Sequence, residues 1–187
     1  MSSPRERIEL RFSATDGIPT GRTCLWRWSV TVHAQTRGRI ASVGTADVVV
    51  FEIGEPDVFD AADEAGADES ACVEALFDPD GFLRDDLTEQ YFDVDRVLLL
   101  NHMVLNKGHR GQGIGPAAAR GIVCRLGGSS MLVAARPQPD GWTEMAPNEL
   151  ALATEKLQRT WQGIGLVPYG DTEHFVGASH VVGRSAS

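Results

Sequence analysis

The sequence His109-Arg110-Gly111-Gln112-Gly113-Ile114-Gly115, which we call the glycine loop, decides the fold because it joins a strand pattern to a helix pattern. Before it, Val94–Leu105 is continuously apolar at its centre, as in a strand that is covered on both faces. After it, Pro116–Leu126 carries apolar residues at helical spacing, with a proline in the first turn, where a missing N–H is tolerated. Glycines allow the backbone to approach a ligand closely, and the free N–H groups of a helix start attract anions. Arg110 adds a fixed positive charge, so the glycine loop predicts a phosphate site.

Alternating and β-branched stretches on both sides of this unit predict further strands, and amphipathic stretches predict helices. The predicted strands are Ile8–Phe12, Leu25–Ala34, Ile40–Ile53, Met131–Ala135, Leu166–Tyr169 and His174–Ala178. The predicted helices are Val58–Ala65, Ser70–Phe77, Leu83–Tyr91 and Glu149–Gln162. Turns are expected at Thr15–Gly21 and Arg37-Gly38, and Gly183–Ser187 is expected to be a frayed tail. This order predicts one domain over residues 1–187, of the α/β (α+β) class.

The negative charge of the chain is concentrated in one segment. The net charge is -9, yet residues Glu52 to Asp95 hold 16 acidic residues against Arg84 alone, which is -15 and leaves +6 for the rest. Such a segment repels phosphates, so nucleic acid is not expected as a partner. It can steer a cationic substrate or partner, although a solvated, partly flexible insert is the simpler interpretation.

Other residue types predict a cytoplasmic, thiol-reduced and metal-free protein. The N-terminus is charged and has no apolar core of a signal peptide, and no apolar run is long enough to cross a membrane. The cysteines and histidines show neither a disulfide framework nor the spacing of metal ligands. They are Cys24, Cys72, Cys124, His33, His102, His109, His174 and His180.

The stretch Arg110-Gly111-Gln112-Gly113-Ile114-Gly115 resembles the R-x-x-G-x-G signature of the GNAT superfamily of N-acetyltransferases. The resemblance extends from Val97 to Val176, where strand, loop, helix, strand, helix and strand pair follow in the family's order. It implies a mixed, mainly antiparallel central sheet flanked by helices and splayed beside the glycine loop. It also implies acetyl-CoA or another acyl-CoA as cosubstrate, with no metal. The glycine loop from His109 to Gly115 would hold the pyrophosphate through the N–H groups of Gln112 to Gly115, and the backbone near Leu105 would pair with the pantetheine arm.

Two other interpretations of the glycine loop remain open. The residues Gly113 to Ala118 also fit the G-x-G-x-x-A fingerprint of dinucleotide-binding proteins. In that fingerprint the glycines follow the strand at once and an acidic residue ends the next strand. Here residues 106–110 intervene, and Arg136 stands at the strand end. The second interpretation, a loop that merely turns the chain, leaves Arg110 and the adjacent free amides without a role.

The chain departs from the family in three places. Only about a dozen residues separate Phe12 from Leu25, too few for the two helices that usually border the acceptor site. We expect the acidic segment, Gly54–Asp93, to form that wall as a helical insert between the third and fourth strands. Trp161 stands four residues before Gly165, where many members have a tyrosine as general acid, and its apolar spacing favours a place in the core. The central strand has no carboxylate to act as base.

Three residues are therefore candidates for catalysis. Asn101 alternates with Met103 and Leu105, so it can face the cleft and position a water molecule, although a structural role is equally compatible. Glu52 ends the third strand and Tyr169 opens the last strand pair; both can reach the cleft in this architecture. His102 is expected to point away from Asn101. Trp26 and Trp28, on one face of their strand, are expected in the core, with an aromatic wall for the acceptor as the alternative.

The predicted function is acyl transfer from acyl-CoA to the amine of a small molecule or peptide, by direct attack on the thioester. A cationic acceptor is favoured by the acidic segment. The alternative is a noncatalytic protein of the same fold that binds acyl-CoA or a protein partner. No membrane partner is expected, and a homodimer is left open.

Overall fold

A computed structural model describes residues 7–15, 24–36, 39–128 and 130–184. The turn predicted at Arg37-Gly38 lies outside these residues, as does the predicted turn after Thr15. Of the predicted C-terminal tail, Gly183 and Arg184 are described, and the Gly183 N–H donates to the carbonyl of Ser179. None of the helices in the described residues has the length and apolar character that crossing a membrane requires.

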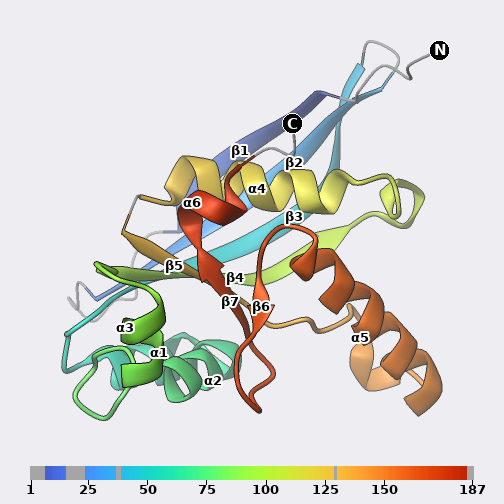
Figure 1. The fold of residues 1–187 in the computed structure, drawn as a ribbon. Coiled ribbons are helices and arrows are strands. Elements are labelled where there is room, and N and C mark those ends of the chain that lie inside the picture. The colour runs from blue at the N-terminus through green and yellow to red at the C-terminus, as the bar shows by residue number, and fades with distance from the viewer. Residues whose placement is uncertain (1–6, 16–23, 37–38, 129, 185–187) are drawn as a thin grey trace.

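Seven strands form one sheet in the order β1-β2-β3-β4-β5-β7-β6 (Figure 1). All neighbouring pairs are antiparallel except β4 and β5, which are parallel. The predicted strands are confirmed, with shifted ends. The strands are β1 Arg7–Thr15, β2 Leu25–Thr36, β3 Arg39–Glu52, β4 Arg96–Leu105, β5 Met131–Ala135, β6 Val167–Pro168 and β7 Phe175–Ala178.

Six α-helices accompany the sheet in the described residues, and the shortest of them, α6, was not predicted. The helices are α1 Val58–Ala65, α2 Ala67–Leu76, α3 Asp85–Gln90, α4 Ile114–Leu126, α5 Pro147–Gln162 and α6 Ser179–Val182. The 3-10 turns are η1 Lys107–His109 and η2 Trp142–Glu144. This mixed architecture with a mostly antiparallel sheet agrees with the fold class that the sequence predicted.

The two faces of the sheet are covered by different helices (Figure 1). Helices α1 to α3 cover one face, which we call the α2 face, and α4 covers the other, the α4 face. Strand β4 contributes to both cores, because Val97 and Leu99 pack beneath α1–α3 whereas Leu98 and Leu100 pack beneath α4. The prediction that this strand is buried on both faces is thereby confirmed.

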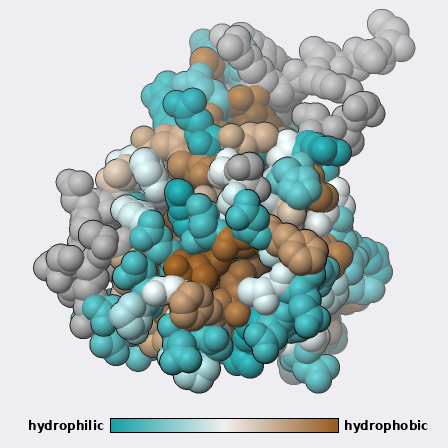
Figure 2. All heavy atoms as spheres, turned by 60° about the vertical axis from the view of Figure 1, so that its left-hand side comes forward, coloured by the Kyte–Doolittle hydropathy of each residue, from teal (hydrophilic) through white to brown (hydrophobic). Residues whose placement is uncertain are grey.

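Several large hydrophobic residues are exposed to solvent. Trp28 packs against the core on the α4 face, as predicted, but Trp26 is 40% exposed, so its expected place in the core is wrong. Phe82 and Phe92 are also exposed. Figure 2 shows one area where hydrophobic residues reach the surface, ringed by hydrophilic ones.

A β-bulge interrupts β4 at Asn101. His102 is in register with Asp47 of β3, and Leu100 is in register with the next residue, Val48, so Asn101 is the extra residue. An extra residue reverses the alternation of side chains beyond it. Met103 accordingly packs on the α4 face, the same face as Leu100 three positions earlier. The sequence-based prediction assumed a regular strand and missed this reversal.

Beyond the bulge, β4 continues without β5. The parallel pairing runs from Arg96 with Met131 to Leu100 with Ala135 and stops there, whereas β4 stays paired with β3 as far as Leu105. The segment from Asn101 to Leu105 therefore has no strand partner on its β5 side among the described residues. The sheet is splayed beside the glycine loop, as the resemblance implied.

The acidic segment folds into α1, α2 and α3 between β3 and β4. Its apolar residues Val58, Leu76 and Leu87 are fully buried and belong to the core of the α2 face. The segment is thus an ordered cover for one end of that face. Its description as an insertion relative to other proteins stays a prediction.

Candidate functional site

The glycine loop forms an open cradle at the start of α4. Gly111 has φ 76° and Gly113 has φ 78°, left-handed conformations that side chains with a Cβ disfavour. A Cβ built on Gly108, Gly111 or Gly113 would meet no heavy atom within 4 Å. The glycines are therefore not needed for internal packing, and the space above them is free for a ligand.

The backbone donors of the cradle are those of the first turn of α4. Gly113 is the N-cap, and no side chain caps the helix there. The first N–H groups of a helix have no partner within it, and the helix dipole favours an anion beside them. The Ala117 N–H is the first to point back into the helix, to the carbonyl of Gly113 at 3.2 Å. The N–H groups of Ile114 and Gly115 therefore have no acceptor within α4, an arrangement that favours an anion beside the glycine loop.

Arg110 fastens the glycine loop to the end of β4. Its Nε donates to the Leu105 carbonyl at 2.7 Å, and its guanidinium forms an exposed ion pair of 3.1 Å with Asp140. The resemblance implied that the backbone near Leu105 pairs with the pantetheine arm, and the Leu105 carbonyl of that backbone already accepts a hydrogen bond. Gln112 Nε2 donates back to the Gly108 carbonyl at 2.9 Å, and His109 Nδ1 is buried without a partner in the described part of the chain.

A buried carboxylate lies behind the bulge. Glu69 of α2 is 2% exposed and accepts a hydrogen bond of 2.9 Å from Asn101 Nδ2. Arg27 of β2 pairs with the same carboxylate oxygen and also donates to the Ala65 carbonyl at 3.1 Å. This network joins β2, α2 and β4 at the point where the sheet splays.

Sequence reasoning missed Glu69, although a signal was present. Glu69, Cys72, Val73 and Leu76 are buried and follow one another at helical spacing on α2. A carboxylate in such a stripe must find partners, because an unpaired buried charge is costly. Burial and the nearby Glu69 charge both raise the pKa of the Cys72 thiol, burial being the larger cause, so Cys72 stays protonated.

The bulge corrects the expected orientation of Asn101 and His102. Asn101 bonds to α2, whereas Met103 and Leu105 pack against the clusters of the α4 face, so Asn101 does not share their face. His102 does not point away from Asn101 either. It is exposed and in register with Asp47, whose side chain accepts a hydrogen bond from Ser29 at 3.0 Å on the α2 face.

Glu52 and Tyr169 are not brought to the bulge. Glu52 is in register with Arg96 at the opposite end of β4, five positions before Asn101 or roughly 17 Å along a strand. Tyr169 Oη donates to Asp86 of α3 at 3.0 Å. Burial, this hydrogen bond and the Asp86 charge raise the pKa of Tyr169 to about 12, against an opposing effect of Arg84. Tyr169 therefore stays protonated and braces the β6–β7 hairpin against α3.

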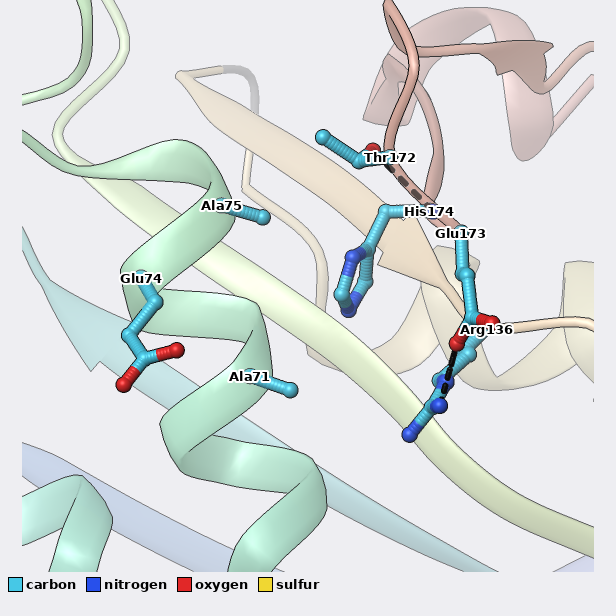
Figure 3. A pocket seen from close by; sticks show the side chains of 7 residues that line it. All are labelled: Ala71, Glu74, Ala75, Arg136, Thr172, Glu173 and His174. Atoms are coloured by element: carbon cyan, nitrogen blue, oxygen red, sulfur yellow. Dashed lines mark hydrogen bonds and ion pairs between the residues drawn. The ribbon is translucent and has the colours of Figure 1, made fainter.

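A pocket of about 310 Å³ opens on the α2 face (Figure 3). Helix α2 supplies one wall and the β6–β7 turn supplies the other, with Arg136 just past the end of β5. The lining residues are Ala71, Glu74, Ala75, Arg136, Thr172, Glu173 and His174. None of them was a candidate in the sequence, because they come from three separate segments of the chain.

His174 is the buried polar residue of this pocket. Its side chain points toward α2 (Figure 3), the residue is 3% exposed, and neither ring nitrogen has a hydrogen-bond partner in the described residues. Burial lowers the pKa of His174, and Arg136 lowers it further, while Glu173 and Asp68 act in the opposite direction. The imidazole is therefore neutral at pH 7 and has one nitrogen that can accept a proton.

Arg136 is neutralised by two carboxylates. It pairs with Asp68 of α2 at 3.1 Å and with Glu173, to which its Nε donates at 2.8 Å. These bonds connect the end of β5 to α2 and to the β6–β7 turn. They fix the walls of the pocket relative to one another.

Trp161 lies in the core of the α4 face and is 8% exposed, which confirms its predicted structural position. Its Nε1 has no partner among the described residues. No group of three or more His, Cys, Asp and Glu side chains within the described part of the chain is arranged to hold a metal ion.

No family model and no curated protein matches this sequence. Four chains of solved structures match its fold. One is the crystal structure of a tyrosine-to-phenylalanine mutant of KacT, at 7% sequence identity and a TM-score of 0.46, over 83% of this chain and 73% of that chain.

Proposed function

We propose that this protein is an acyl-CoA-dependent acyltransferase that transfers an acyl group, most simply acetyl, to an amine. The observation that carries the proposal is the alignment of two features. The glycine cradle offers phosphate donors at the start of α4. Directly before it, the edge of β4 from Asn101 to Leu105 has no strand partner on the β5 side among the described residues. Apart from the Leu105 carbonyl, which accepts a hydrogen bond from Arg110, this edge suits an extended pantetheine arm.

The reaction needs an amine nitrogen to attack the thioester carbonyl, and the C–S bond then breaks with the electron pair leaving on sulfur. The negative charge that develops on the carbonyl oxygen needs fixed hydrogen-bond donors. The bulge supplies an unpaired backbone residue at Asn101, where β4 and β5 separate. Glu69 holds the Asn101 side chain and so supports this part of the strand.

Replacement of Gly113 by valine tests the cradle. A Cβ there meets no neighbouring atom, so the only cost to the fold is the strain of the positive φ, and the side chain would fill the space above the loop. We expect CoA affinity to fall at least tenfold in isothermal titration calorimetry. Gly170→Val is the matched control, since Gly170 also has a positive φ of 51° and open space around it but lies outside the glycine loop. Equal CoA affinity in the parent and in the Gly113 variant would contradict the proposal.

A noncatalytic acyl-CoA-binding protein is the second candidate. Trp161 favours it, because a buried tryptophan stands where the resemblance implies a tyrosine acid for the CoA thiolate. The two candidates differ in one assay: release of free CoA from acetyl-CoA with a panel of amines. CoA binding without amine-dependent release would select the noncatalytic protein.

A further inference from the structure

The pocket lies beside the place where the sheet opens. Leu100, Ala135 and Phe175 are in register across β4, β5 and β7. The next residues in this row are Asn101, Arg136 and His174, and all three bond to α2 or line the pocket beneath it. Neighbouring strands are separated by about 4.8 Å, so β4 and β7 lie roughly 10 Å apart where they are paired through β5. The pocket therefore lies about two strand spacings, or roughly 10 Å, from the bulge.

His174 can accept a hydrogen bond from a ligand. Both ring nitrogens are buried and unpaired among the described residues, a condition that folded proteins normally avoid. The ring points into the pocket toward α2 (Figure 3). The neutral imidazole is the side chain best suited to take a proton near pH 7. An amine N–H directed at one of its nitrogens satisfies this requirement.

The charges around the pocket favour a cation. Arg136 is neutralised by Asp68 and Glu173, so its charge is not available to an anion. Glu74, an exposed residue of α2, lines the rim of the pocket on the side of the helix turned away from His174 (Figure 3), and its side-chain carboxylate has no hydrogen bond or ion pair with a described residue. Ala71 and Ala75 form an apolar surface next to it. An alkyl chain would contact Ala71 and Ala75, and an ammonium group at its far end would pair with Glu74.

We propose that this pocket binds an alkyl diamine, that His174 is the general base for its reacting amine, and that Glu74 holds its second, cationic amine. The assignment rests on the proposed acyl transfer. As the nitrogen forms its bond to the thioester carbon, His174 takes the proton that the nitrogen gives up. The C–S bond breaks and the electron pair leaves on the CoA sulfur. The imidazolium then returns the proton to solvent, from which the thiolate is protonated.

The first test replaces His174 by glutamine and uses 1,4-diaminobutane and acetyl-CoA as probes. We expect kcat to fall about a hundredfold, which is a typical contribution of a general base, while CoA affinity stays within twofold of the parent. In the parent, kcat/KM should fall as the pH drops below the His174 pKa, which burial and then Arg136 lower and which Glu173 and Asp68 raise. Glu74 also lines this pocket. Glutamine cannot titrate, so this acid limb should disappear in the variant. Turnover of the variant within threefold of the parent would overturn the assignment.

The pH profile of the parent tests the assignment of His174 even if the His174 variant does not fold. A parent profile without an ionisation on the acid side of pH 6.5 also overturns the assignment of the base, whatever the variant does. The thermal midpoint of the His174 variant, measured by circular dichroism, shows whether its fold is intact.

The second test separates the binding of the cationic amine by Glu74 from the proton transfer to His174. Glu74→Gln should raise KM for 1,4-diaminobutane at least tenfold and leave KM for butylamine, which lacks the second amine, unchanged. Glu64→Gln is the matched control, since Glu64 is an exposed carboxylate of the same acidic segment that does not line the pocket. Equal effects of the two variants would overturn the role of Glu74.

A failure of the proposed acyl transfer can be distinguished from a failure of the diamine site. If the parent neither binds CoA nor releases it from acetyl-CoA, the acyltransferase proposal and the role of His174 as its base fail together. The pocket is then decided by titrating 1,4-diaminobutane into the protein while observing histidine imidazole signals by NMR. A shift of the His174 signals that Glu74→Gln abolishes retains the diamine site, and no shift overturns it.

Discussion

At the scale of single residues, Glu69 joins three elements through one carboxylate. Its partners Arg27 and Asn101 lie on β2 and β4, and its own helix covers them from above. A buried ion pair contributes little net stability compared with apolar packing, but the loss of one partner leaves the other charge uncompensated. Glu69 is therefore costly to remove even though it sits in a segment of mostly exposed carboxylates.

We expect Glu69→Ala to lower the free energy of unfolding by about 3–5 kcal/mol, the range for breaking a buried ion pair. Chemical unfolding in urea measures it. Glu64→Ala, an exposed carboxylate on α1, should change stability by less than about 0.5 kcal/mol. Similar values for both variants would show that the Arg27–Glu69–Asn101 network does not stabilise the fold.

His174 predicts how stability depends on pH. Its pKa is lowered in the folded protein, so between that pKa and the unfolded value of about 6.5 the unfolded chain binds more protons. Stability should therefore fall as the pH drops below about 6.5, by at most about 1.4 kcal/mol per pH unit from this group, until the folded pKa is reached. His174→Gln should remove that part of the slope in urea unfolding between pH 7 and pH 5. An unchanged slope would mean that His174 is protonated equally in both states.

At the scale of elements, α4 and α5 differ in how firmly they are held. Helix α4 buries five residues: Ile114, Ala118, Ala119, Ile122 and Val123. Helix α5 buries Trp161 alone, and its other predicted core positions Leu150, Ala153 and Leu157 are only half-buried. Figure 1 shows α5 extending away from the sheet. Its apolar stripe was predicted correctly, but the sequence does not show how much of a stripe is covered.

Native-state hydrogen exchange should therefore be fastest, among the two longest helices, in the N-terminal half of α5. Local opening needs little free energy where few apolar contacts are broken. We expect amides of residues 151–154 to exchange at least tenfold faster than those of residues 118–123 in α4, measured by NMR. Equal protection of the two helices would imply that α5 is covered in solution, for instance by a second copy of the chain.

The positions of most elements could be predicted because they depend on local patterns. Periodicity located the strands, and glycine spacing located the cradle, since both signals lie within a few consecutive residues. The pocket could not be predicted in this way. Glu74, Arg136 and His174 lie far apart in the sequence, and only the pairing of β5 with β7 and the packing of α2 bring them together. In the sequence, Arg136 was notable only because a dinucleotide-binding site would have an acidic residue at that position.

At the scale of the whole molecule, the acidic helices and the glycine loop serve opposite faces of the sheet (Figure 1). The anionic cosubstrate that we propose at α4 would thereby be kept away from the excess negative charge of α1–α3. A cation that approaches the His174 pocket meets that charge first. Exposed charges act over about 8–10 Å at physiological salt, so their effect is on approach and local concentration.

The affinity of the protein for 1,4-diaminobutane should consequently fall as the salt concentration rises. Neutralising Asp85 and Glu89 of α3 together should weaken binding two- to threefold at low salt and flatten the salt dependence, as measured by calorimetry. Asp86 is left intact because it accepts the Tyr169 hydroxyl. The control neutralises Glu144 and Glu149, which are exposed outside the acidic segment and change the net charge equally. Equal behaviour of both double variants would leave the acidic segment without a steering role.

The bulge at Asn101 also sets the spacing of the apolar residues along β4. Leu98 and Leu100 lie on the α4 face, and so do Met103 and Leu105, with a gap of three between the pairs. Deleting the codon for Asn101 would close this gap and leave an uninterrupted period of two with the same apolar residues inward. We expect the shortened chain to fold, as measured by circular dichroism, to pair β4 with β3 without a bulge, and to lose CoA binding in calorimetry. The cleft would then be the product of a single inserted residue, removable without rebuilding the core.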